Sequence, residues 1–113
     1  MSGVFGGLNY QPLTSITSNA GAVAWNLDAN PNAFLQLTEN TVITLSGGVA
    51  GQVYSIEIKQ HASSAKTCTF ANVNRASGDS AYAVSTGLSK RDTIGVRKNN
   101  DGTYDEANFK TWG

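Results

Sequence analysis

The residues of this chain best suited to nucleophilic or acid–base catalysis are its one histidine and its one cysteine. His61 is followed by three small residues and reads as part of a loop. A general base needs a nucleophile or an orienting carboxylate within reach, and no motif near His61 supplies either. Cys68 alternates with threonines in the segment KTCTF, as a small filler of a strand does. We therefore expect an ordinary loop histidine and a buried cysteine, with no catalytic residue.

Metal binding has equally little support in the sequence. One Cys and one His exclude an internal disulfide and a zinc cluster. Asp101, Asp105 and Glu106 lie close to Gly102 and invite a calcium interpretation, but the DxDxDG spacing with a distant Glu is absent. A solvated turn explains these acids better. We expect no metal and no cofactor.

Two patterns could favour an anionic ligand. Gly47-Gly48 and Gly51 are spaced as in some phosphate loops, but no Gly-Lys-Ser/Thr follows them, so turns between strands are expected. The densest run of basic residues is interrupted by Asp92 and lacks interleaved aromatic residues. It contains Lys90, Arg91, Arg97 and Lys98. We interpret this cluster as a solvated strand edge, with contact to an anionic partner surface as the alternative.

Composition narrows the function classes further. Only 14% of the 113 residues are charged, the eight basic residues balance the eight acidic ones, and Ser, Thr and Asn occur eleven times each. Such a chain has no global field to attract nucleic acid or an anionic membrane. Its first twenty residues do not read as a signal peptide, and no apolar run is long enough to span a bilayer. We expect synthesis in a cytoplasm and no nucleic-acid or membrane partner.

Apolar residues near both ends of the chain are candidates for a partner interface. They lie outside the best strand patterns, and an exposed terminal Trp is unusual in so polar a chain. The candidate interface residues are Phe5, Leu8, Tyr10, Phe109 and Trp112. These ends either fold back on their own core or dock against another chain, and the sequence leaves both alternatives open.

Hydrophobic periodicity predicts an all-β fold. In residues 53–60, Tyr54, Ile56 and Ile58 alternate with polar side chains, which is typical of a half-buried strand. Asn100-Asp101-Gly102 is the strongest hairpin signal. Further strands are expected at residues 13–17, 23–27, 35–37, 41–45, 67–70, 81–84 and 93–98 and near Tyr104, with turns between them.

These elements predict a single antiparallel β-sandwich, jelly-roll-like, with about eight to nine short strands and little or no helix. We expect a flexible N-terminal arm at residues 1–12, the sandwich domain at 13–106 and a C-terminal tail at 107–113. The predicted core contains Trp25, Leu27, Leu37, Tyr54, Ile56, Ile58 and Phe70.

The order of short motifs along residues 22–105 resembles a β-sandwich module of small virion proteins of tailed bacteriophages, of the capsid-decoration and tail-fibre type. The motifs that carry the resemblance are Trp25-Asn26, Leu37 to Thr41, Gly51-Gln52, Gln60, Thr67 to Phe70, Asp92 to Val96 and Asp101 to Thr103. The loop at residues 72–79 lacks the tryptophan of that module. The resemblance implies a virion structural role and no catalytic residue.

We therefore expect a non-enzymatic capsid decoration or cement protein. It would bind the outer surface of the shell as a homotrimer, with the major capsid protein or another virion protein as partner. One alternative is a tail or neck fibre or tip protein for host attachment. Another is a carbohydrate-binding adhesin module using Trp25, Tyr82, Asn72 and Asn74, although the alternation of Trp25 with Val23 and Leu27 indicates that it belongs to the core.

Overall fold

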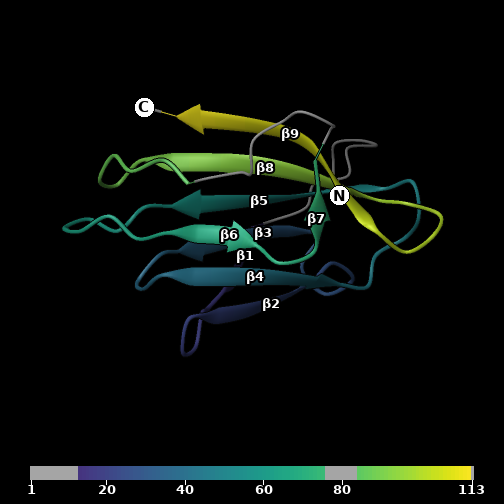
Figure 1. The fold of residues 1–113 in the computed structure, drawn as a ribbon, viewed down its shortest axis with the longest axis horizontal. Coiled ribbons are helices and arrows are strands. Elements are labelled where there is room, and N and C mark those ends of the chain that lie inside the picture. Colours follow the sequence, from purple (N-terminus) through teal and green to yellow (C-terminus); the bar gives the residue numbers. More distant parts are fainter. Residues whose placement is uncertain (1–12, 76–83, 113) are drawn as a thin grey trace, which may run out of the picture.

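The computed structural model describes residues 13–75 and 84–112. Within these ranges the chain forms nine strands and no helix, in agreement with the predicted all-β character (Figure 1). The strands are β1 (Thr14–Ile16), β2 (Ala22–Asn26), β3 (Asn32–Gln36), β4 (Thr41–Ser46), β5 (Val53–Lys59), β6 (Cys68–Phe70), β7 (Val73–Asn74), β8 (Arg91–Lys98) and β9 (Tyr104–Trp112).

The first six strands alternate between two sheets. A six-stranded sheet has the order β1-β3-β5-β8-β9-β7, and a three-stranded sheet has the order β2-β4-β6. The chain therefore winds three times through both sheets, as in a flattened parallel β-helix, and strands one coil apart pair in parallel. This differs from the expected antiparallel sandwich: of the seven strand pairs among the described residues, only β5–β8 and β8–β9 are antiparallel.

The coils differ in length, which hides the winding in the sequence. In the three-stranded sheet, Ala22 pairs with Val42, which lies 20 residues later, whereas Val42 pairs with Thr69 after a further 27 residues. The extra residues lie in the connections between strands, so no fixed sequence period marks the coils.

An antiparallel hairpin extends the larger sheet. The turn between β8 and β9 contains Gly102 with a φ of +89°, and Asp101 Oδ1 accepts hydrogen bonds from the Thr103 N–H and hydroxyl at 3.0 and 2.6 Å. The Asp-Gly hairpin is thus confirmed. Strand β9 continues to Trp112, so the expected boundary between residues 106 and 107 falls inside a strand. A register shift between Gly95 and Val96 leaves Ala107 as the extra residue of β9.

The two sheets enclose one hydrophobic core. All seven predicted core residues belong to it, and Trp25, Leu27, Leu37, Ile56 and Ile58 are fully buried. Within β5 the buried positions are 54, 56 and 58, as the period of two predicts. Trp25 also satisfies its indole N–H internally, by donating to the Asn30 carbonyl at 2.7 Å.

Side chains at the corners tie successive coils together. Glu39 Oε2 accepts hydrogen bonds from the Ser18 hydroxyl at 2.8 Å and from the Gly21 N–H at 3.0 Å. Asn72 pairs through its side-chain amide with both the N–H and the C=O of Leu45, each at 3.0 Å. Such bonds satisfy main-chain groups where the strand ladders end.

Two expectations concern regions that the structure covers only in part. The predicted strand at 81–84 lies outside the described residues except for Val84, which is not in a strand. The short strand β7 lies where a turn was expected, and it pairs in parallel with β9. The expected arm at residues 1–12 lies outside the described residues.

Candidate binding face

The outward side of the six-stranded sheet carries two rows of polar, charged and aromatic side chains. The first row crosses β3, β5, β8 and β9 and consists of Gln36, Lys59, Arg91 and Trp112. The neighbouring row consists of Phe34, Glu57, Thr93 and Lys110. Residues directly opposite one another in adjacent strands share a face, so both rows point away from the core. We call Lys59, Arg91, Lys110 and Trp112 the basic–aromatic face.

Trp112 is the aromatic residue of this face. Its side chain is 43% exposed, and its indole N–H donates a hydrogen bond to the Thr93 hydroxyl at 2.9 Å. The Lys110 ammonium lies 5.9 Å from the ring centroid, within cation–π range. Because its backbone is also paired with β8, the ring is held in place while almost half of it meets solvent.

Charge on this face is mainly positive. Lys59, Arg91 and Lys110 face one acidic residue of the two rows, Glu57, whose carboxylate lies 3.8 Å from the Arg91 guanidinium. The Arg91 side chain is half exposed, so this pair is a weak surface contact. The face therefore keeps a net positive charge next to an exposed indole.

The outward side of the three-stranded sheet differs sharply. Its strand residues are small and uncharged: Ala22, Ala24, Asn26, Val42, Thr44, Ser46 and Thr69, and all of them are exposed. This surface offers no charged group of its own strands to a ligand. The two outer surfaces thus present different chemistry on one common core.

The structure places the two described candidate interface residues on opposite sides of β9. Phe109 pairs with the buried Ile94 and so lies on the core-facing side of the sheet, where its side chain is 44% exposed. Trp112 lies on the outward side. A single flat contact therefore cannot use both rings. Phe5, Leu8 and Tyr10 lie outside the described residues.

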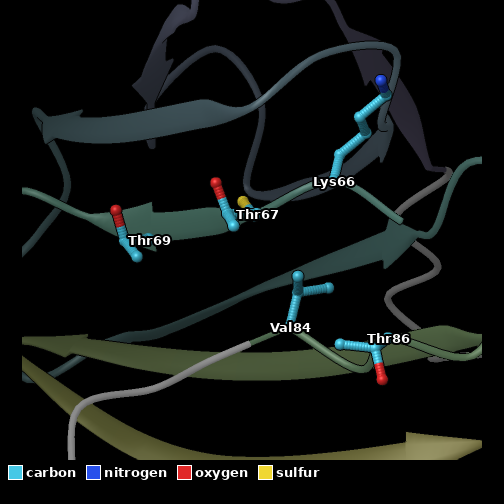
Figure 2. A pocket seen from close by; sticks show the side chains of 6 residues that line it. Lys66, Thr67, Thr69, Val84 and Thr86 are labelled. Atoms are coloured by element: carbon cyan, nitrogen blue, oxygen red, sulfur yellow. The ribbon is translucent and has the colours of Figure 1, made fainter. Parts of the chain in front are cut away.

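A groove of about 180 Å³ lies between β6 and residues 84–86 (Figure 2). The residues that line it are Lys66, Thr67, Cys68, Thr69, Val84 and Thr86. The Cys68 side chain is buried, as predicted, and burial, followed by the charge of Asp92, raises the pKa of its thiol to about 12. The thiol thus stays protonated at neutral pH, and burial disfavours the reactive thiolate form.

His61 organises its own loop. It is half buried, and its Nδ1 accepts hydrogen bonds from the Ser63 and Ser64 N–H groups, each at 3.1 Å. The predicted loop histidine is therefore present, but it is less exposed than expected. No carboxylate contacts its ring among the hydrogen bonds and ion pairs of the described residues.

Sequence reasoning missed two buried polar residues beside this loop. The Gln60 side chain donates to the carbonyls of Lys66 and Ser85 at 2.9 Å and accepts from the N–H groups of His61 and Lys66 at 2.8 Å. Asp92 Oδ2 accepts from the Ser85 N–H at 2.7 Å. Both residues continue the inward alternation of their strands, which is the signal that could have revealed them.

The basic cluster at the ends of β8 does not form the expected strand edge, because β8 pairs with β5 on one side and with β9 on the other. The Lys98 ammonium donates to the carbonyls of Gly47 and Gly48 at 3.1 and 3.2 Å and lies 5.8 Å from the Tyr104 ring centroid, so it closes a turn. Arg91 belongs to the basic–aromatic face. Gly47, Gly48 and Gly51 adopt positive φ, as expected of turns.

The residues first considered for sugar binding do not form a site. Trp25 is fully buried, Asn72 pairs with the backbone of Leu45, and Asn74 donates to Asp105 Oδ1 at 3.4 Å. Tyr82 lies outside the described residues. An exposed indole is supplied instead by Trp112, at the far end of β9.

Three findings bear on other site types. Within residues 13–75 and 84–112, no three His, Cys, Asp or Glu side chains group closely enough to hold a metal ion. The same residues include no helix that could span a membrane. Comparisons of this chain with known protein families, curated proteins and solved structures found no match.

Proposed function

We propose that this chain is a non-enzymatic structural protein of a tailed-bacteriophage particle. In this proposal it is a decoration or cement protein that assembles as a homotrimer on the outer surface of the capsid and stabilises the shell. The order of the motifs along residues 22–105 supports the assignment to virion proteins, and the all-β fold is compatible with it.

The observation that carries the proposal is the pair of exposed rings on opposite sides of β9. A decoration protein needs two contacts, one between its own copies and one to the shell. Phe109 and Trp112 offer one aromatic anchor to each side of the same strand. Aromatic side chains held by a sheet lose little entropy on binding and often dominate interface energies.

One observation favours the host-attachment alternative. The basic–aromatic face joins an exposed indole to three cations on a broad outward surface, which suits recognition of an external ligand as well as attachment to a shell. A tail or neck tip would use the same face on the host surface.

Immunogold electron microscopy tests the proposal. Antibodies raised against the purified chain are applied to particles purified from the lysate of the source phage. We expect gold labels over the shell of purified particles, and sedimentation of the isolated chain as a trimer. Labels confined to the tail would replace the decoration role by host attachment. Purified particles that lack the chain altogether would contradict a virion role.

A matched pair of variants tests the copy-to-copy contact. Phe109→Ala should shift the sedimenting species towards the monomer, whereas Val42→Ala on the opposite sheet should leave it unchanged. Circular dichroism checks that both variants remain folded. A trimer that survives Phe109→Ala would show that this side of β9 is not the contact.

A further inference from the structure

We propose that the basic–aromatic face binds a linear anionic polysaccharide carrying carboxylate groups. This inference rests on the host-attachment alternative of the proposed function, in which the basic–aromatic face meets an external ligand; in the decoration role the same face would contact the shell instead. It goes beyond a structural role, since it assigns a ligand class to Lys59, Arg91, Lys110 and Trp112.

The dimensions of the face suit a chain ligand. The row from Gln36 through Lys59 and Arg91 to Trp112 crosses four adjacent strands, which lie about 4.8 Å apart, so it extends about 14 Å. A step between strands is comparable to the length of one pyranose unit. A polysaccharide lying along the row would place successive sugars over successive side chains.

The row offers two kinds of contact that a sugar acid can make, stacking on a ring and pairing with cations. The apolar C–H face of a pyranose stacks on an exposed aromatic ring, and Trp112 supplies such a ring with its orientation fixed by Thr93. Carboxylates of the same ligand would pair with the guanidinium of Arg91 and the ammonium groups of Lys59 and Lys110. The hydrogen-bond donors and the ring thus cover different parts of one ligand.

Two other partners fit the face less well. A protein interface has an apolar core of several packed side chains, whereas Trp112 here is surrounded by charged and polar residues. Single-stranded nucleic acid needs several exposed aromatic rings on which successive bases stack. Apart from Trp112, the aromatic residue of the two rows is Phe34, which is only partly exposed and is separated from β8 and β9 by Glu57 of β5. Both partners are nevertheless outcomes of the test below.

The test measures binding of the full chain to defined probes by calorimetry. The probes are alginate oligosaccharides as the carboxylated glycan, dextran as the neutral glycan, poly-L-glutamate as the carboxylated peptide and a single-stranded oligonucleotide. We expect alginate to bind, dextran to bind far more weakly and alginate affinity to fall as salt is raised. Absence of alginate binding would overturn the inference.

Variants separate the ring from the charge. Trp112→Ala should weaken alginate binding about tenfold, and Trp112→Phe should retain most of it. Lys59→Gln should weaken binding to a similar degree, whereas Lys66→Gln removes the same charge beside the groove of β6 and should change little. Thermal melting of each variant excludes loss of fold as the cause.

The remaining outcomes also decide the inference. Equal affinity for alginate and poly-L-glutamate, with no effect of Trp112→Ala, would make the face a general anion surface suited to an acidic protein. Preference for the oligonucleotide would make it a nucleic-acid surface. Particles that carry the chain while it binds no alginate would leave the virion role standing and remove this ligand. Alginate binding by a chain absent from particles would support this ligand and remove the virion role.

Discussion

The two outer surfaces of this molecule rest on the same core but differ in chemistry. The outward residues of β2, β4 and β6 are small and uncharged, whereas those of β5, β8 and β9 include Lys59, Arg91, Lys110 and Trp112. Both surfaces result from the same alternation along strands. The fold needs only the inward residues to be apolar, so outward residues are free to serve binding.

The residues that hold the fold differ from those that are available to a partner. The inward positions of both sheets form one cluster, and substitutions there should affect both surfaces together. Outward substitutions should affect binding to the surface that carries them and should leave the stability of the fold unchanged. The following variants test this separation.

Ile56→Ala should have the largest effect. Ile56 is fully buried in the core shared by both sheets. Loss of burial together with the cavity that remains should lower the free energy of unfolding by about 2–5 kcal/mol. Urea unfolding measures this change. A loss below about half a kilocalorie would mean that the core shared by the two surfaces is not centred on β5.

Gln60→Leu should have the next largest effect. The variant leaves main-chain groups of His61, Lys66 and Ser85 without their side-chain partner. Stability should fall by about 1–3 kcal/mol, and amide exchange should quicken first in residues 61–66 and 84–90. Uniform exchange over the whole chain would show that Gln60 supports the core as a whole rather than this end.

Glu39→Gln should act through pH. Hydrogen bonds from the Gly21 N–H and the Ser18 hydroxyl hold the pKa of the Glu39 carboxyl below its ordinary value of 4.5. The ionised form therefore stabilises the fold above that value, and this contribution is lost as pH falls through the lowered pKa. The variant should be less stable than the wild type at about pH 7, and the difference should shrink at about pH 3. A difference that grows on acidification would contradict this sign.

Thr44→Lys should have the smallest effect. Thr44 is exposed at the centre of the uncharged surface, so stability should change by no more than about 0.5 kcal/mol. Binding of alginate should also be unchanged, in contrast to Lys59→Gln on the other surface. Loss of alginate binding in Thr44→Lys would show that the ligand binds the three-stranded sheet, and our assignment to the six-stranded sheet would be wrong.

The sequence predicts inward and outward residues better than it predicts strand pairing. Alternation identified Ile56 and Ile58 correctly, because it depends only on the period of two. It carries no direction, so parallel coils and antiparallel hairpins have the same pattern. The unequal spacing of Ala22, Val42 and Thr69 then removed the repeat that would have revealed the coils.

The candidate site was predicted only in part. Trp112 was named as a candidate interface residue in a tail, and the structure places it in a strand, where it is 43% exposed. The extra residue Ala107 breaks the alternation between Tyr104 and Trp112, so the sequence gives no continuous strand pattern there. The neighbours of Trp112 come from β5 and β8, and only pairing across the sheet brings Lys59 and Arg91 to its side.

Amide chemical-shift mapping during titration with alginate oligosaccharides tests the central claim most directly, namely that the inward residues hold the fold while the outward side of the larger sheet binds the ligand. Our account predicts shifts confined to the outward ladder of the larger sheet, around Lys59, Arg91, Thr93 and Lys110 to Trp112, while β2 and β4 remain unchanged. Shifts centred on Val42 and Thr44, or spread evenly over both sheets, would contradict it.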